Sequence, residues 1–137
     1  PATPDGRQAD DSLSENVGPS YGTPRCSPTS ILGAMSALPF DHTPSGAATL
    51  ALAAADTRGP HGLALITALL KGYFRDGGLH VQFNVLDAGQ LEAAMAEPER
   101  HADLIVRVTG FSAYFTQLTR NVQEDLVRRY RRDVAAT

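Results

Sequence analysis

Residues 107–115 read RVTGFSAYF, and they decide how the second half of the chain is interpreted. They continue the apolar run Leu104-Ile105-Val106, so residues 103–108 are predicted to form a β-strand. Gly110 then interrupts a series of β-branched and aromatic residues. A glycine inside a strand usually marks a bulge, a tight bend or a close approach of another backbone. On this interpretation, replacing Gly110 by alanine changes stability alone.

Gly110 also has a chemical interpretation, because glycine has no Cβ to shield its Cα–H bonds. Loss of a hydrogen atom leaves a radical that lies flat between two amides. The amide nitrogen donates electron density to this radical and the carbonyl withdraws it, so the unpaired electron is delocalised. A side chain would hinder the flat geometry and block the approach of a partner. The residues alone leave both interpretations open.

Residues 77–137 are predicted to form a strand, a helix, a strand, a glycine loop and a helix. Residues 79–86 alternate between polar and apolar side chains, which is typical of a strand with two different faces. The polar face carries His80, Gln82 and Asn84. Buried polar groups need hydrogen-bond partners. This face is therefore predicted to point at a polar interior or at the glycine loop, and a solvated sheet face is the alternative.

Two helices flank the strand at residues 103–108. Asp87 is predicted to cap a helix that ends near Pro98, and Thr119 is predicted to cap the last helix of the chain. The apolar residues of the last helix recur at helical spacing: Val122, Leu126 and Tyr130. This order of elements indicates an α/β fold. The two strands are predicted to be parallel neighbours, because a helix connects them.

The first part of the chain is less regular. Residues 1–28 are rich in Pro, Gly, Ser and Asp and are predicted to form an irregular arm. Residues 29–76 are predicted to contain helical and strand segments. Ser27 and Pro28 mark the start of a short helix that Pro39 ends.

Two further elements are predicted between residues 49 and 78. Residues 49–55, TLALAAA, fit either a helix or a short buried strand, and the sequence leaves this choice open. Pro60 opens a clearer helix, which Gly77 and Gly78 end. Its apolar positions recur at helical spacing: Leu63, Ile66, Leu69, Leu70, Tyr73 and Phe74.

The composition is that of one globular domain with a modest core. The chain has 137 residues, of which 42% are hydrophobic and 20% are charged, and its net charge is −3. This charge gives no strong attraction to nucleic acid or to an anionic membrane. No apolar run approaches the ~20 residues needed to span a bilayer. We therefore expect neither nucleic acid nor membrane as a partner.

The cysteine and histidine residues indicate whether disulfide bonds or a metal site are expected. The single cysteine, Cys26, excludes an internal disulfide and fits a reducing cytosol, so a cytoplasmic location is expected. His42, His61 and His101 share no metal-ligand spacing, so no metal site is predicted. The sequence shows no signal-peptide pattern. It begins at Pro1 without a methionine, so a processed or excised piece of something longer is expected.

These stretches resemble the glycyl radical enzyme family, the pyruvate formate-lyase-like group. RVTGFSAYF resembles the family's radical loop, R-V-x-G-[YF]-x-x-x-F. GGLHVQFNVLDAGQLEAA, residues 77–94, resembles the segment G-G-x-H-x-Q-x-N-V before that loop, and LTRNVQEDLVRR, residues 118–129, resembles the helix after it. Residues 3–32 resemble the T-P-[DN]-G-R stretch and the segment that follows. The resemblance is looser over residues 40–62, where Ser45 stands at a position that is commonly asparagine.

The resemblance implies the C-terminal part of a ten-stranded β/α barrel, with Gly110 on a loop between a strand and the last helix. It also implies a partner, a radical-SAM activating enzyme that holds S-adenosylmethionine and an iron–sulfur cluster and removes a hydrogen atom from Gly110. The chain itself is expected to bind no permanent cofactor. Oxygen cuts the backbone at a glycyl radical, so oxygen sensitivity and anaerobic metabolism are implied as well.

Further candidate site residues follow the same resemblance. Arg107 is a candidate anchor for the loop, and simple solvation is the equal alternative. Ser112 and Tyr114 share a face of an extended chain, so their hydroxyls are candidates to order the loop, with ordinary packing as the alternative. Phe111 stands at a position that is commonly tyrosine. The SAY that follows resembles the dehydratase, lyase and decarboxylase branches of the family.

The family enzyme is several times longer than this chain, and its thiyl cysteine lies well upstream of the matched region. Cys26 is not in that context and is interpreted as a partly buried structural thiol. Three hypotheses remain open. The chain is the radical-bearing part or small subunit of a lyase, a spare part that repairs an oxygen-damaged enzyme, or a non-catalytic α/β interaction domain. The first two predict an apolar surface that a larger partner covers, and a small-molecule substrate of unknown identity.

Overall fold

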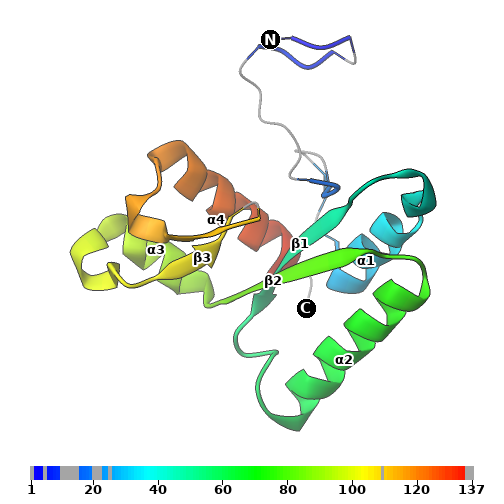
Figure 1. Ribbon diagram of the computed structural model, residues 1–137. Helices are drawn as coiled ribbons and strands as arrows, with labels where there is room; N and C mark the ends of the chain where they lie inside the picture. The colour runs from blue at the N-terminus through cyan, green and yellow to red at the C-terminus, as the bar shows by residue number, and fades with distance from the viewer. Residues whose placement is uncertain are drawn as a thin grey trace.

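A computed structural model of the chain describes residues 2–4, 6–9, 16–19, 23–24, 26–108 and 110–134 (Figure 1). Its centre is a parallel pair of strands, β1 (Ala47–Ala53) and β2 (His80–Leu86). A separate antiparallel hairpin is formed by β3 (Ile105–Arg107) and β4 (Ser112–Tyr114). Four helices, α1 to α4, surround these strands. The chain therefore has a mixed α/β fold, as the sequence predicted.

One face of the β1–β2 pair packs against α1 (Pro28–Ser36) and α2 (Gly59–Arg75) (Figure 1). Both helices begin with a proline in the first turn, and the Ser27 side chain accepts a hydrogen bond from the Ser30 amide at 3.2 Å, which caps α1. The apolar cluster on this face, which we call the α1–α2 cluster, contains eight buried residues: Ile31, Leu32, Met35, Ala48, Leu50, Leu52, Leu69 and Tyr73. The sequence left β1 open between helix and strand, and this two-sided burial explains its continuous apolar pattern.

The opposite face packs against α4 (Arg120–Val134), α3 (Ala88–Ala96) and the hairpin. Asp87 caps α3 by accepting a hydrogen bond from the Gly89 amide at 3.0 Å, and Pro98 follows the helix. The second apolar cluster, here the α4 cluster, contains ten buried residues: Ala51, Leu86, Leu91, Ala94, Leu104, Val106, Val108, Phe115, Leu126 and Tyr130. The three turns of 3₁₀ helix are Phe40–His42, Pro98–His101 and Phe115–Gln117.

The predicted parallel pairing of the two strands on either side of α3 is wrong. β3 pairs with β4 in antiparallel register, Ile105 opposite Tyr114 and Arg107 opposite Ser112. The backbone groups of β2 pair with β1 instead, from Ala47 opposite His80 to Ala53 opposite Leu86. β4 has only three residues, too few for a periodic pattern, and the sequence predicts a loop there.

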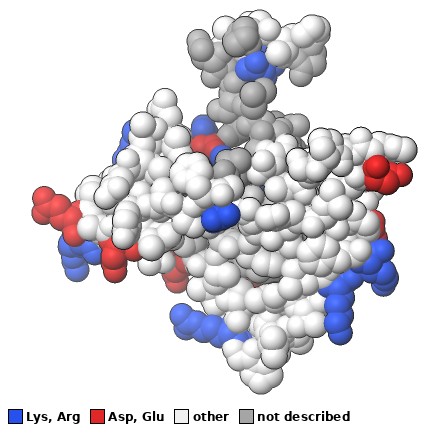
Figure 2. Space-filling model, in the orientation of Figure 1, with Lys and Arg blue, Asp and Glu red and all other residues white. Residues whose placement is uncertain are grey.

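The described residues of the predicted arm, within residues 1–28, include no helix or strand before Pro28. Residues 2–4 and 6–9 lie away from the body of the protein in Figure 1, whereas Val17 packs beside the α1–α2 cluster and the Pro19 carbonyl accepts a hydrogen bond from Arg132 at 3.3 Å. No helix within the described residues is both long enough and apolar enough to cross a membrane. On the face shown in Figure 2, most charged side chains lie towards the margins. Several large apolar side chains are exposed: Leu38, Leu63, Phe74, Leu79, Val85, Ile105, Phe111 and Tyr114.

Candidate functional site

Gly110 lies at the tip of the β3–β4 hairpin, where the chain reverses. The Val108 amide donates to the Phe111 carbonyl at 2.9 Å and closes the hairpin around residues 109 and 110. Gly110 has a φ of +79°, in the region that side chains disfavour, and Thr109 lies outside the described residues. Apart from its chain neighbours, no atom of the described residues lies within 4 Å of a Cβ built on Gly110. The backbone conformation alone therefore accounts for a glycine, and the exposed tip also leaves its Cα open to approach.

The Arg107 side chain connects this tip to β2. Its Nε donates to Gln82 Oε1 at 2.9 Å and its Nη2 donates to the Gly110 carbonyl at 3.0 Å. A third, longer contact runs from Nη1 to Ser112 Oγ at 3.3 Å. The rigid, planar guanidinium presents its donors in a fixed fork, so contact with Gln82 orients the donor that reaches Gly110. The structure thus places half-buried Arg107 as a bridge between two elements.

Asn84 holds the backbone of the same residue. The Arg107 amide donates to Asn84 Oδ1 at 2.8 Å, and Asn84 Nδ2 donates to the Arg107 carbonyl at 2.8 Å. One side-chain amide therefore satisfies both backbone groups of a β3 residue, as a neighbouring strand would. This contact fixes the base of the hairpin tip against β2.

His80 completes the polar face of β2. Its Nε2 lies 2.9 Å from Gln82 Nε2, and its imidazole is exposed. The polar face that the alternating sequence predicted thus points towards the glycine hairpin through Gln82 and Asn84. His80 also lines an open hollow of about 450 Å³ between the starts of β1 and β2, which Ser45 lines as well.

The remaining predicted site residues lie around the tip with different surroundings. The Ser112 hydroxyl contacts Arg107, as described above. Phe111 and Tyr114 are 54% and 44% exposed, and Tyr114 lies opposite the exposed Ile105 across the hairpin. Exposed apolar side chains of the hairpin therefore lie beside the polar pair of Arg107 and Ser112.

The sequence analysis missed the residues that hold the chain after the hairpin. Phe115 is fully buried, and its carbonyl accepts a hydrogen bond from the buried Gln123 Nε2 at 2.9 Å. Gln123 follows Val122 on the inner side of α4. In the sequence, the signal that could have identified Gln123 is a polar residue next to the apolar stripe of a helix. This contact fixes β4 to the last helix.

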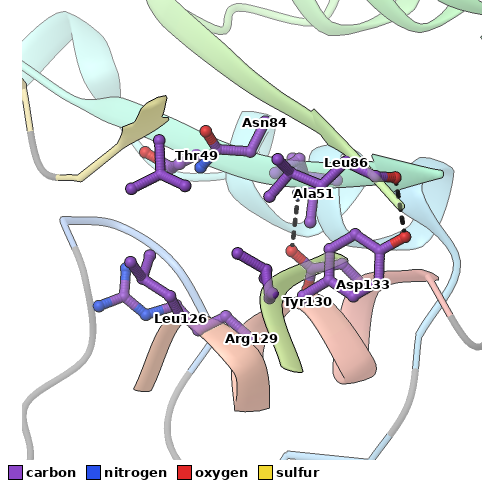
Figure 3. Close-up of a pocket in the computed structure, with 11 residues that line it drawn as sticks. Thr49, Ala51, Asn84, Leu86, Leu126, Arg129, Tyr130 and Asp133 are labelled. Atoms are coloured by element: carbon purple, nitrogen blue, oxygen red, sulfur yellow. Dashed lines mark hydrogen bonds between the residues drawn. The ribbon is translucent and has the colours of Figure 1, made fainter. Parts of the chain in front are cut away.

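A small cavity lies between β1, β2 and α4 (Figure 3). Beside it, the Ala51 amide donates to Asp133 Oδ2 at 3.0 Å, and the Tyr130 hydroxyl donates to the Leu86 carbonyl at 3.0 Å. Thr49 Oγ1 is buried there without a hydrogen-bond partner among the described residues. The volume of about 20 Å³ fits one water molecule and is too small for an organic substrate.

Cys26 lies on the other side of the sheet. Its thiol is partly buried beside the α1–α2 cluster and donates to the Pro24 carbonyl at 3.2 Å. Among the described residues, no three His, Cys, Asp or Glu side chains gather as a metal site would require. The hairpin, by contrast, packs on the α4 cluster, so Cys26 and Gly110 belong to opposite sides of the β1–β2 pair.

Comparison with known proteins places this hairpin in a family. Residues 13–116, which include Gly110, match the family model described as "Glycine radical". Trans-4-hydroxy-L-proline dehydratase of Clostridioides difficile is 35% identical over 130 residues, covering 93% of this chain and 16% of the dehydratase. The 4-hydroxyphenylacetate decarboxylase glycyl radical subunit of Clostridium scatologenes is 34% identical over 131 residues, covering 93% of this chain and 14% of that subunit.

The fold is also similar to a solved structure. It is from a study of 1,2-propanediol dehydration in Roseburia inulinivorans and matches with a TM-score of 0.84 and 37% sequence identity. The match covers 93% of this chain and 16% of that one. The chain thus spans about one sixth of the length of the proteins it resembles.

Proposed function

The chain belongs to the glycyl radical family, and from that premise we propose that it is the radical-bearing part of a larger glycyl radical enzyme, with Gly110 as the radical site. The observation that carries this proposal is the position of Gly110. It stands at the exposed tip of a hairpin inside the matched region, and apart from Gly110 and its chain neighbours no described atom lies within 4 Å of the place a Cβ would take. A hydrogen-abstracting group can therefore reach its Cα.

The chemistry at Gly110 is the transfer of a hydrogen atom. One Cα–H bond breaks homolytically, and the hydrogen atom forms a new C–H bond with the carbon radical that the activating enzyme supplies. The unpaired electron stays on the Gly110 Cα. In turnover, Gly110 takes a hydrogen atom back from a cysteine thiol, whose S–H bond breaks to leave a thiyl radical. That thiyl radical then takes a hydrogen atom from the substrate.

The thiyl cysteine is proposed to lie on another polypeptide or on a part of the enzyme beyond this chain. Cys26 is separated from Gly110 by the β1–β2 pair and packs beside the α1–α2 cluster. The partner is proposed to cover the exposed apolar side chains of the hairpin, Ile105, Phe111 and Tyr114. Apolar contacts of this kind are typical of the interfaces of permanent complexes.

The reaction is proposed to be a radical elimination or decarboxylation of a small molecule. The relatives include a trans-4-hydroxy-L-proline dehydratase and a 4-hydroxyphenylacetate decarboxylase glycyl radical subunit, and the names of these two relatives support the two reaction types proposed here. The radical at Gly110 is proposed to be sensitive to oxygen, because the exposed tip offers it no cover within this chain.

Anaerobic electron paramagnetic resonance tests the proposal. The chain is activated with a radical-SAM activating enzyme and S-adenosylmethionine in the presence of a candidate large subunit. We expect a doublet, split by the one hydrogen left on the Gly110 Cα, which collapses to a singlet when the chain is labelled with α-deuterated glycine. Gly110→Ala is expected to abolish the signal.

Gly59→Ala is the matched control. Gly59 also has a positive φ, +64°, and a Cβ there would also meet no atom within 4 Å. Both substitutions therefore cost about 1–2 kcal/mol of backbone strain, whereas only Gly110→Ala removes the radical. Loss of the doublet in both variants, or in neither, would contradict the proposal.

Restoration of an oxygen-cleaved, complete enzyme by this chain would identify it as a spare part, and activity only with a subunit that lacks its own glycine loop would identify a split enzyme.

A further inference from the structure

Arg107 contacts the very carbonyl through which a radical at Gly110 would be delocalised. Its Nη2 donates to the Gly110 oxygen at 3.0 Å. We propose that this guanidinium tunes the radical: it draws unpaired spin from the Gly110 Cα onto the carbonyl and so stabilises the radical state. The inference rests on the proposed function of Gly110.

The physical reason lies in the two groups that flank the radical carbon. The amide nitrogen donates electron density and the carbonyl withdraws it. A hydrogen bond from a cation polarises the carbonyl more strongly than a neutral donor, because charge-assisted hydrogen bonds are about twice as strong. Arginine side chains keep their charge in proteins. The carbonyl of Gly110 therefore becomes a better acceptor of spin when Arg107 is in place.

The effect acts on the distribution of spin and not on net charge. Hydrogen-atom transfer removes a proton and an electron together, so the charge of Gly110 is the same before and after. Arg107 therefore has no new ion pair to form when the radical appears. Its contribution is the part of the hydrogen bond that strengthens as the carbonyl oxygen gains electron density.

The surrounding contacts hold the guanidinium in position before any radical forms. Gln82 accepts from Nε at 2.9 Å, and Asn84 binds the Arg107 backbone through two hydrogen bonds of 2.8 Å. The donor to Gly110 is therefore oriented from β2 and does not depend on the turn alone. Gln82 and Asn84 are positioning residues in this arrangement, since they act through Arg107.

The obvious alternative is that Arg107 only ties down the turn. A purely structural role predicts lower stability in a variant without the guanidinium, with an unchanged radical spectrum once the radical has formed. Tuning predicts a changed spectrum. The α-proton splitting of the doublet is proportional to the spin on Cα, so the two roles are separated by one measurement.

The test is electron paramagnetic resonance of the activated full chain, in the assay described above, comparing Arg107→Met with Ser112→Ala. Arg107→Met removes the donor to the Gly110 carbonyl and keeps a long apolar stem. Ser112→Ala removes another contact of the same guanidinium and leaves that donor in place. We expect a larger α-proton splitting in Arg107→Met, a smaller spin share on the carbonyl in samples labelled with [1-¹³C]glycine, and a yield of radical about threefold to tenfold lower. Ser112→Ala is expected to match the wild-type spectrum.

An unchanged splitting in Arg107→Met would overturn the inference and leave the proposed function intact. The absence of a doublet in the wild-type chain would remove the proposed function itself, and the inference with it. Should Arg107→Met form no radical, Gln82→Leu decides, because it keeps the guanidinium but removes its support from β2. A larger splitting in Gln82→Leu supports tuning, and an unchanged splitting refutes it.

Discussion

Strand β2 has two neighbours, and it is joined to them in different ways. Its backbone pairs with β1 in a parallel ladder from Ala47–His80 to Ala53–Leu86. Its connection to the hairpin instead uses the side chains of Gln82 and Asn84, which bind Arg107 at 2.8–2.9 Å. The first joint is a continuous hydrogen-bonded strand pair in the apolar core. The second is a small set of polar contacts near the surface.

The difference shows how one small domain can combine a stable frame, the β1–β2 pair with its two apolar clusters, with a hairpin tip that can open locally. Separating β1 from β2 would expose the interiors of both apolar clusters, whereas freeing the tip breaks a few hydrogen bonds. The base of the hairpin stays in the α4 cluster through Val106 and Phe115. Local opening with a low free energy is characteristic of segments with few apolar contacts. In the proposed function, such opening would let the already exposed Gly110 tip move into the active site of an activating enzyme.

The largest expected effect comes from damaging the frame. Leu50→Ala removes a fully buried side chain of β1 from the α1–α2 cluster. It is expected to lower the free energy of unfolding by about 2–5 kcal/mol, through lost burial and the cavity left behind. Urea denaturation measures this. The control is Leu63→Ala on α2, where the side chain is 69% exposed and the expected change is within about 0.5 kcal/mol. Similar losses in the two variants would contradict the position of the core.

Asn84→Ala is expected to act on the polar joint. It removes both side-chain hydrogen bonds to the Arg107 backbone and costs about 1–3 kcal/mol, because two half-buried backbone groups lose their partner. The sharper readout is hydrogen exchange, which should accelerate at the Arg107 amide and leave the β1 amides protected. Asn84→Asp keeps an acceptor for the amide and should protect Arg107 better than alanine does. Equal acceleration throughout the chain would show that the two joints are not separate.

The two tyrosines at the ends of β2 give a finer comparison. Tyr130 donates to the Leu86 carbonyl at 3.0 Å, and Tyr73 donates to the His80 carbonyl at 3.3 Å. Tyr130→Phe is expected to cost about 1 kcal/mol at neutral pH, and Tyr73→Phe less, because its hydrogen bond is longer. Thermal unfolding of the two variants measures this order, and the reverse order would contradict it.

Alkaline titration extends the same comparison. Burial, followed by nearby carboxylates, raises the pKa of the Tyr130 hydroxyl above the 10.0 of a free tyrosine. The folded state therefore resists ionisation, and the stability that this group supplies is complete below pH 10 and is lost as the pH rises through the folded-state pKa. Tyr130→Phe should show a shallower loss of stability above that pH. An identical alkaline profile for the variant and the wild type would argue against a buried hydroxyl.

The smallest expected effect is that of Ser112→Ala. Among the described residues its hydroxyl contacts Arg107 alone, at 3.3 Å and at an exposed position, so stability should change by less than about 0.5 kcal/mol. Urea denaturation checks this. A loss as large as that of Asn84→Ala would mean that Ser112, and not the amides of β2, holds the tip.

Local sequence signals predicted the helices and most of the frame. Pro28 and Pro60 lie in the first turns of α1 and α2, and Asp87 caps α3. The alternation over residues 79–86 predicted both the strand β2 and its polar face. These features depend on neighbouring residues alone, which is why one sequence sufficed.

Local sequence patterns could not predict which strands pair. β3 has three residues and β4 has three, which is too short for a pattern of their own, and a helix before β3 favoured the wrong parallel pairing. The contacts of Arg107 were equally out of reach, because Gln82 and Asn84 lie far from it in sequence and meet it only in the folded chain. The sequence indicated which polar residues needed partners, and the fold supplied them.

The hydrogen bonds that run from Arg107 through Gln82 to His80 all have the same donor-to-acceptor direction. A guanidinium only donates, so the oxygen of Gln82 must face Arg107 and its NH₂ group must face His80. His80 Nε2 is then the acceptor, and the imidazole carries its proton on Nδ1. The arginine at the hairpin thus selects the tautomer of a histidine at the far end of the strand, and imidazole ¹⁵N shifts would read that selection directly.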